Sequence, residues 1–169
     1  MSNDKNIIRV AFYKNGEGLF HSIIRLYTGS IYSHAELVMP DGVTWITLSP
    51  VFNSRVTPRI VGEYDEDKWD FIDLPLSWRQ PVREYQEKQL KKFIEETSGN
   101  SYDWAGMLLS HLSPFKIRRA NRWYCSEWIA HALLYSRIVM WDEIKMYNIP
   151  DMSPGRLHDL LENCRPKYR

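Results

Sequence analysis

Cys125 has the sequence surroundings expected of a nucleophile. It follows a Trp-Tyr pair, and the apolar residues after it recur at helical spacing, so the pattern predicts that it lies in the first turn of a helix. The free N–H groups and the partial positive charge of a helix N-terminus favour a thiolate, and they can hold the oxyanion of an acyl-transfer reaction. The alternative is that Cys125 is a small core residue, as many free cysteines are.

A cysteine nucleophile needs a base within hydrogen-bonding distance and a third group that orients the base. His34 is the candidate base, because it lies in an alternating stretch, residues 33–39, that predicts a strand on which Glu36 shares its face. A carboxylate there can hold the imidazole in one tautomer and stabilise the imidazolium. The alternative is that His34 and Glu36 form the solvent-exposed face of a hairpin.

The other histidines are weaker candidates for the base. His131 lies six residues after Cys125, about 600° around a helix, and is expected to face elsewhere. His21, His111 and His158 lie in segments predicted to be helical and have no evident partner.

The elements that must position these residues are strands in the first half of the chain and mostly helices in the second. Strands are predicted at residues 7–13, 33–39, 43–48 and 69–74, with a Pro-Asp-Gly turn at 40–42. Helices are predicted around residues 20–27, at 82–97, at 102–112, from 125 onward and at 153–163. The pattern predicts an α+β fold, with a small antiparallel sheet packed against helices, in a single domain over residues 1–169.

The composition argues against several classes of protein. Lys and Arg number 22 against 21 Asp and Glu, a net charge of +1, so no nucleic-acid partner is expected. Two cysteines are too few for a disulfide framework or a four-cysteine zinc site, and no nucleotide-binding or metalloprotease motif occurs, so neither a cofactor nor a metal is expected. No run approaches roughly 18 apolar residues, so no transmembrane segment is expected. The N-terminus lacks the apolar core of a secretory signal, which predicts a chain that is cytoplasmic as synthesised, and virion-associated or released by a non-classical route if it leaves.

Four motifs, in order, resemble those of circularly permuted papain-like hydrolases of the NlpC type. They are GEGLFHSIIRLYTGSIYSHAELV, SYDWAGML, YCSEW and SPGRL, and the resemblance spans roughly residues 8–160. The resemblance implies Cys125 as nucleophile and His34 as base, with the histidine before the cysteine because of the permutation. It implies Glu36 as the third member, as in a subgroup with a His-x-Glu pattern. Thr47 and Ser49 on the next strand are poor substitutes for a carboxylate.

The resemblance also implies a function, a cysteine hydrolase that cleaves an amide bond in a peptide or a peptidoglycan stem peptide through a thioester. One alternative is a lipid-directed acyl hydrolase or acyltransferase with the same triad, and another is a papain-like binding module without activity. Four basic residues before the cysteine would either steer an anionic substrate or form a solvated loop: Lys116, Arg118, Arg119 and Arg122. Tyr124 is expected to pack beneath the helix start, and Cys164 to be inert.

Overall fold

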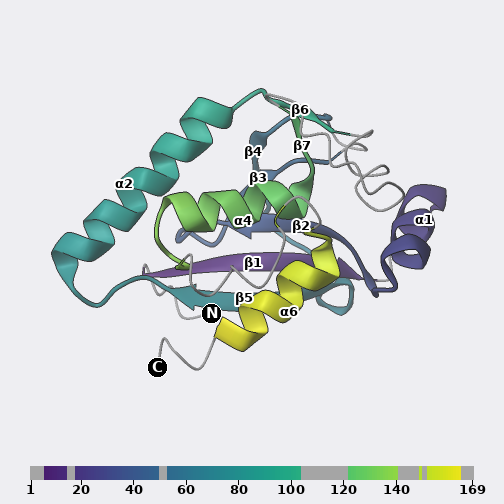
Figure 1. Cartoon of the computed structure of the whole chain (residues 1–169), viewed down its shortest axis with the longest axis horizontal. Coiled ribbons are helices and arrows are strands. Elements are labelled where there is room, and N and C mark those ends of the chain that lie inside the picture. The colour runs from purple at the N-terminus through teal and green to yellow at the C-terminus, as the bar shows by residue number, and fades with distance from the viewer. Residues whose placement is uncertain are drawn as a thin grey trace.

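The structure is a computed structural model that describes residues 6–14, 18–49, 53–103, 122–140, 149 and 152–164. At its centre lies a five-stranded antiparallel sheet in the order β4-β3-β2-β1-β5. Its strands are β1 (Ile7–Lys14), β2 (Tyr32–Val38), β3 (Thr44–Thr47), β4 (Thr57–Ile60) and β5 (Trp69–Pro75). Together with the helices, this sheet confirms the predicted α+β class (Figure 1).

Helices cover the sheet and extend beyond its edge (Figure 1). The helices are α1 (Leu19–Thr28), α2 (Gln80–Thr97), α4 (Cys125–Tyr135) and α6 (Pro154–Cys164), with a short 3-10 turn, η1 (Glu66–Lys68). Both α4 and α6 contact β2, α2 packs on α4, and α1 stands at the edge of the molecule with β2 as its main contact. A second small sheet pairs β6 (Ser101–Tyr102) in parallel with β7 (Arg122–Trp123). No helix within the described ranges is both long enough and apolar enough to cross a membrane.

Alternation along β1 divides its side chains between two apolar clusters. Ile8, Val10 and Phe12 are fully buried in the larger cluster, together with apolar side chains of α4 and α6. Ala11 belongs to the smaller cluster around Trp45. The neighbouring strand β2 is buried along its whole length. A polar side chain on either face of β2 must therefore find its partners inside the protein.

The structure adds one strand that the sequence did not predict, and it corrects two other interpretations. The sequence pattern did not indicate β4, which contains Pro58; proline is tolerated there because β4 is an edge strand. Tyr102, predicted to begin a helix over 102–112, lies in β6, and residues 104–112 fall outside the described part of the chain. The alternative in which His34 and Glu36 form a solvent-exposed face is wrong, because both residues are buried.

Candidate active site

Cys125 is the first residue of α4, as its sequence surroundings predict. The backbone of Tyr124 is extended, with φ −110° and ψ 162°, and its carbonyl accepts the N–H of Trp128 at 2.9 Å, so Tyr124 is the N-cap. The strand β7 leads into this turn, and the N–H of Asp103 donates to the carbonyl of Trp123 at 2.7 Å. Cys125 is only 4% exposed. The pairing of β6 with β7 thus fixes where the helix begins and holds the sulfur inside the protein.

The structure brings His34 to the sulfur of Cys125, although the two residues are far apart in the sequence. A side-chain hydrogen bond joins them. Nε2 of His34 lies 3.1 Å from Oε1 of Glu36. Because the carboxylate engages Nε2, Nδ1 is the ring nitrogen left for the sulfur. The three residues predicted from the sequence therefore form one chain of hydrogen bonds.

The partly unpaired edge of β2 helps to explain how the sulfur of Cys125, at the start of α4, reaches His34 on this strand. Among the described residues, β3 pairs with β2 only near the C-terminal end of β2, at Leu37 and Val38. The N–H of Ala35 donates to the sulfur of Cys125, and so does the N–H of Ser126 in the first turn of α4. A strand and a helix N-terminus thus direct N–H groups at the same sulfur, which favours its charged form.

Glu36 is a buried carboxylate with partners on both oxygens. Its Oε1 accepts from the hydroxyl of Thr47 at 3.1 Å, in addition to its contact with His34. Its Oε2 accepts from the guanidinium of Arg59, with Nε at 2.9 Å and Nη2 at 2.8 Å. That guanidinium also lies over the ring of Trp45, 5.4 Å from the ring centroid. Because Glu36 is only 3% exposed, these partners are what allow it to remain ionised.

Arg59 is one of the site residues that sequence reasoning missed, and Tyr102 is another. The one signal for Arg59 is Glu36 itself, because a buried carboxylate requires a cation nearby. The strand that carries Arg59 also contains Pro58, which hides its strand character. Thr47, considered only as a poor replacement for a carboxylate, has a different place: it donates a hydrogen bond to Glu36.

The pKa shifts of the site describe an ion pair. Burial raises the pKa of the Cys125 thiol, but the charge and hydrogen bond of His34 and the two N–H groups outweigh it, and the pKa is lowered. Burial lowers the pKa of His34, but the sulfur and Glu36 outweigh it and raise the pKa to about 10. Burial raises the pKa of Glu36, and here His34 and Arg59 bring it below its ordinary value. Each partner therefore stabilises the charged form of the other, which favours a thiolate and an imidazolium.

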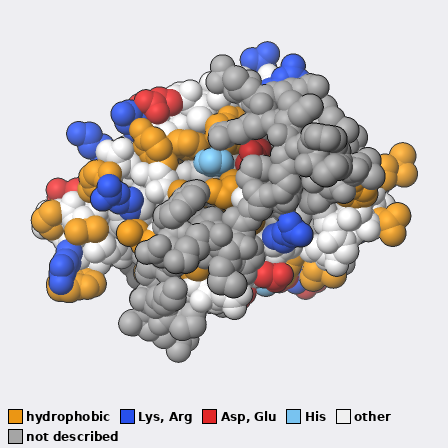
Figure 2. Space-filling model, viewed as in Figure 1, with side chains coloured by type: hydrophobic (Ala, Val, Ile, Leu, Met, Phe, Trp, Pro, Cys, Tyr) orange, Lys and Arg blue, Asp and Glu red, His pale blue; other side chains and the backbone are white. Residues whose placement is uncertain are grey.

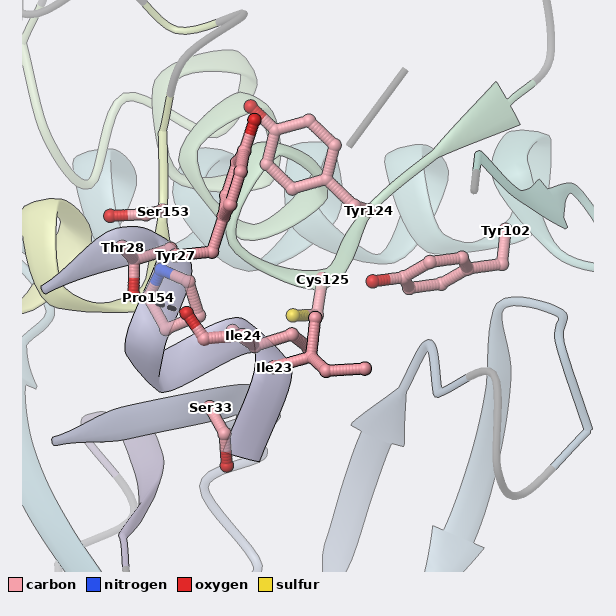
Figure 3. Close-up of a pocket in the computed structure, with 10 residues that line it drawn as sticks. All are labelled: Ile23, Ile24, Tyr27, Thr28, Ser33, Tyr102, Tyr124, Cys125, Ser153 and Pro154. Carbon is pink, nitrogen blue, oxygen red and sulfur yellow. Dashed lines mark hydrogen bonds between the residues drawn. The ribbon is translucent and has the colours of Figure 1, made fainter. Parts of the chain in front are cut away.

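The sulfur opens onto a small pocket with a largely apolar lining (Figure 3). The side chains that define it include Ile23, Ile24 and Tyr27 of α1, Tyr102 of β6, Tyr124, and Pro154 of α6. In Figure 3, the sulfur of Cys125 points toward the isoleucines of α1. An apolar group bound in this pocket would therefore lie directly beside the sulfur.

Two tyrosines border the sulfur, and their hydroxyl groups differ. The hydroxyl of Tyr102 points toward Cys125 in Figure 3. Burial and the negative groups near it raise the pKa of Tyr102 well above its ordinary value, so its hydroxyl keeps the proton and can donate it in a hydrogen bond. The hydroxyl of Tyr124 donates to the carbonyl of Ile149 at 3.3 Å, a contact that fits the expected packing role.

Two further histidines have partners that the sequence did not indicate. Nδ1 of His21 lies 2.9 Å from the hydroxyl of Ser33, and Nε2 of His158 lies 3.2 Å from the hydroxyl of Tyr32. Both histidines lie in helices, α1 and α6, as predicted. His131 packs its ring against the tryptophan of β7, with 4.9 Å between ring centroids.

The remaining predicted residues do not join the site in the described part of the chain. His111, Lys116, Arg118 and Arg119 lie outside the described residues. Arg122 is exposed in β7, and Cys164 is buried in the apolar core on α6. Among the described residues, no group of three or more His, Cys, Asp or Glu side chains is arranged to hold a metal ion.

Comparisons with protein-family models, with curated proteins and with solved structures give no match to this chain. The interpretation of the site therefore rests on its geometry. The site combines a thiol with a lowered pKa, an imidazole oriented by a carboxylate, and a pocket beside the sulfur. These are the parts that nucleophilic acyl transfer requires.

Proposed function

We propose that this chain is a cysteine hydrolase of the circularly permuted, papain-like NlpC type. Cys125 and His34 are its catalytic residues, and Glu36 orients the histidine. The reaction is cleavage of an amide bond in a peptide or a peptidoglycan stem peptide, a choice of substrate supported by the resemblance in sequence. The observation that supports the proposal best is the hydrogen-bond chain from Glu36 through His34 to the sulfur at a helix N-terminus.

The reaction begins when the thiolate of Cys125 attacks the carbonyl carbon, forming a C–S bond and placing negative charge on the carbonyl oxygen. We assign the stabilisation of that oxyanion to the N–H groups at the start of α4 and to the hydroxyl of Tyr102, which points toward Cys125 (Figure 3). His34 gives its proton to the leaving amine as the C–N bond breaks, and a thioester remains. Water then attacks the thioester while His34 accepts a proton from it, and the thiolate leaves as the acid departs.

The electrostatics of the pair suit this order of events. The thiolate is a main reason why the pKa of His34 is raised to about 10. Once the sulfur is acylated, its negative charge is gone, whereas the burial that lowers the pKa of His34 remains. The imidazolium therefore becomes a stronger acid when the leaving amine needs a proton.

A lipid-directed acyl hydrolase or acyltransferase is the second candidate function, and the pocket lining favours it. The isoleucines of α1 and Pro154 offer no charge to a peptide, but they suit an acyl chain. The same nucleophile and base would serve both reactions. A binding module without activity is the outcome that remains if neither reaction occurs.

Capture of the thioester on Cys125 tests these proposals. The full chain is incubated with stem peptides or with lipid esters, and the reaction is quenched in acid. The protein is then digested, and the masses of its cysteine-containing peptides are measured by mass spectrometry. We expect an acyl adduct on Cys125 and none on Cys164, the second cysteine, which serves as an internal control. Cys125→Ala should abolish both adduct and product.

The class of substrate that yields the adduct decides between the two enzymatic functions. An adduct from stem peptides alone favours the amidase, and one from lipid esters alone favours the lipid-directed enzyme. If neither class yields an adduct and Cys125 alkylates no faster than an ordinary thiol, the enzymatic proposals fail.

A further inference from the structure

The helix α1 carries a row of exposed apolar side chains at the rim of the pocket. Leu19, Ile23 and Leu26 are 79%, 44% and 88% exposed. Their spacing of four and three residues places them on one face of the helix, and we call this row the α1 ridge. Ile24, by contrast, is only 6% exposed. Apolar side chains protrude in Figure 2 at the edge where Figure 1 places α1.

The single Lys or Arg side chain of α1 is Arg25. α1 contains no Asp or Glu, although the chain has 21 acidic residues, and Arg25 lies in its last turn. An apolar face beside positive charge is typical of helices that lie in a lipid–water interface. There, apolar side chains enter the acyl region and cations meet anionic headgroups.

The size of the ridge favours a lipid surface over a second protein. A helix of 10 residues is about 15 Å long, and the ridge is a single row of three side chains on it. A specific protein interface buries roughly 800 Å² on each partner, which is more than such a row supplies. A lipid surface needs no matching shape, and the strength of binding to it scales with the apolar area that enters the lipid and with the attraction of cations to anionic headgroups.

We propose that the α1 ridge docks this protein onto a lipid–water interface that carries anionic headgroups. Ile23 belongs both to the ridge and to the pocket lining, so docking places the mouth of the pocket at the lipid surface. The substrate then enters from the interface rather than from bulk water. This inference goes beyond the proposed function, because docking does not depend on the bond that Cys125 attacks.

Flotation with vesicles tests the proposal. Vesicles of phosphatidylcholine alone are compared with vesicles that hold equal amounts of phosphatidylcholine and phosphatidylglycerol. We expect the full chain to float with the mixed vesicles and to bind less to phosphatidylcholine alone. Leu19→Glu and Leu26→Glu should each weaken binding by about tenfold or more, because a carboxylate replaces a side chain that enters the acyl region. Ile60→Glu, the same kind of change at a 73% exposed isoleucine of β4, should leave binding within about twofold.

Folding and site chemistry are measured on the same variants. Leu19 and Leu26 do not line the pocket, so thermal midpoint and Cys125 alkylation should match wild type. Failure of wild type to float would overturn the proposal. So would an equal loss in Ile60→Glu or in Trp78→Glu, a change at an 84% exposed side chain next to α2. The proposal would also be overturned if the wild type formed an oligomer that Leu26→Glu dissociates and the wild type did not bind vesicles. An unreactive Cys125 with normal flotation would defeat the proposed function and leave the docking intact.

Discussion

Replacement of His34 by alanine should change how the alkylation of Cys125 depends on pH. In the wild type, the imidazolium and two N–H groups stabilise the thiolate against the effect of burial. In His34→Ala the imidazolium is gone, whereas burial still raises the pKa of the thiol. We therefore expect the Cys125 pKa of the variant to lie at or above the ordinary thiol value of about 8.5.

The magnitude follows from the thiolate fraction. For a thiol with a pKa of about 8.5, that fraction rises about 75-fold between pH 6 and pH 8, and the ratio approaches 100-fold for a higher pKa. Because the thiolate is the reacting species, the alkylation rates at the two pH values should stand in the same ratio. The wild-type ratio should be several-fold smaller, because more of its thiol is already ionised at pH 6. The wild-type profile should change again near pH 10, where His34 loses its proton.

The assay is a time course of iodoacetamide labelling read by peptide mass spectrometry, so that Cys125 and Cys164 are followed separately. His158→Ala is the control, because Nε2 of His158 contacts the hydroxyl of Tyr32 and His158 is not among the groups that shift the pKa of Cys125, and it should leave the Cys125 profile within about twofold. Equal pH 8 to pH 6 ratios in wild type and His34→Ala would refute the ion pair, and with it the electrostatic argument for the mechanism.

Arg59→Gln should destabilise the fold by about 2–4 kcal/mol at pH 7, because Glu36 loses one of its two cationic partners. The pKa of Glu36 is lowered in the fold, so its contribution is present above the unfolded pKa and is lost as pH falls through the folded one. The difference in free energy of unfolding between wild type and Arg59→Gln, measured by urea unfolding, should therefore shrink in acid. Arg59→Lys should recover part of the lost stability at pH 7. Gly155→Ala should cost about 1–3 kcal/mol, since a Cβ there would lie 2.7 Å from the Cβ of Ser30. Adding Ser30→Gly should restore stability in a double-mutant cycle. Cys125→Ala should abolish turnover and shift the thermal midpoint by only a few degrees; a collapse of folding would favour the core-cysteine interpretation.

Site residues that belong to local patterns could be predicted from the sequence. His34 and Glu36 are two residues apart, and the period of a strand places them on one face whatever the strand pairs with. Cys125 precedes an apolar stripe at helical spacing, which marks the start of a helix. Each of these features is decided by neighbours within a few positions, so a linear pattern is enough to reveal it.

Partners supplied by distant strands could not be predicted in this way. Arg59 reaches Glu36 across 23 positions of sequence, and its place depends on the register in which β4 pairs with β3. Tyr102 lines the same pocket as Cys125 because β6 pairs with β7, and each of these strands has only two residues, too few for a periodic signal. Register between distant segments is set by packing and turn geometry, which a single sequence does not display.

The charged groups of the site alternate in sign along their contacts: thiolate, imidazolium, carboxylate and guanidinium. A single buried charge is strongly unfavourable, but this row is neutral as a whole and each member contacts an opposite charge. Without Arg59 the row would carry one net negative charge, which the site would relieve by protonating either Glu36 or the sulfur. Arg59, the member farthest from the sulfur, therefore helps to keep Cys125 ionised. In the proposed reaction, acylation removes the negative charge of the sulfur at the other end of the row. The row is then net positive, and the proton of His34 is the positive charge that is most easily released.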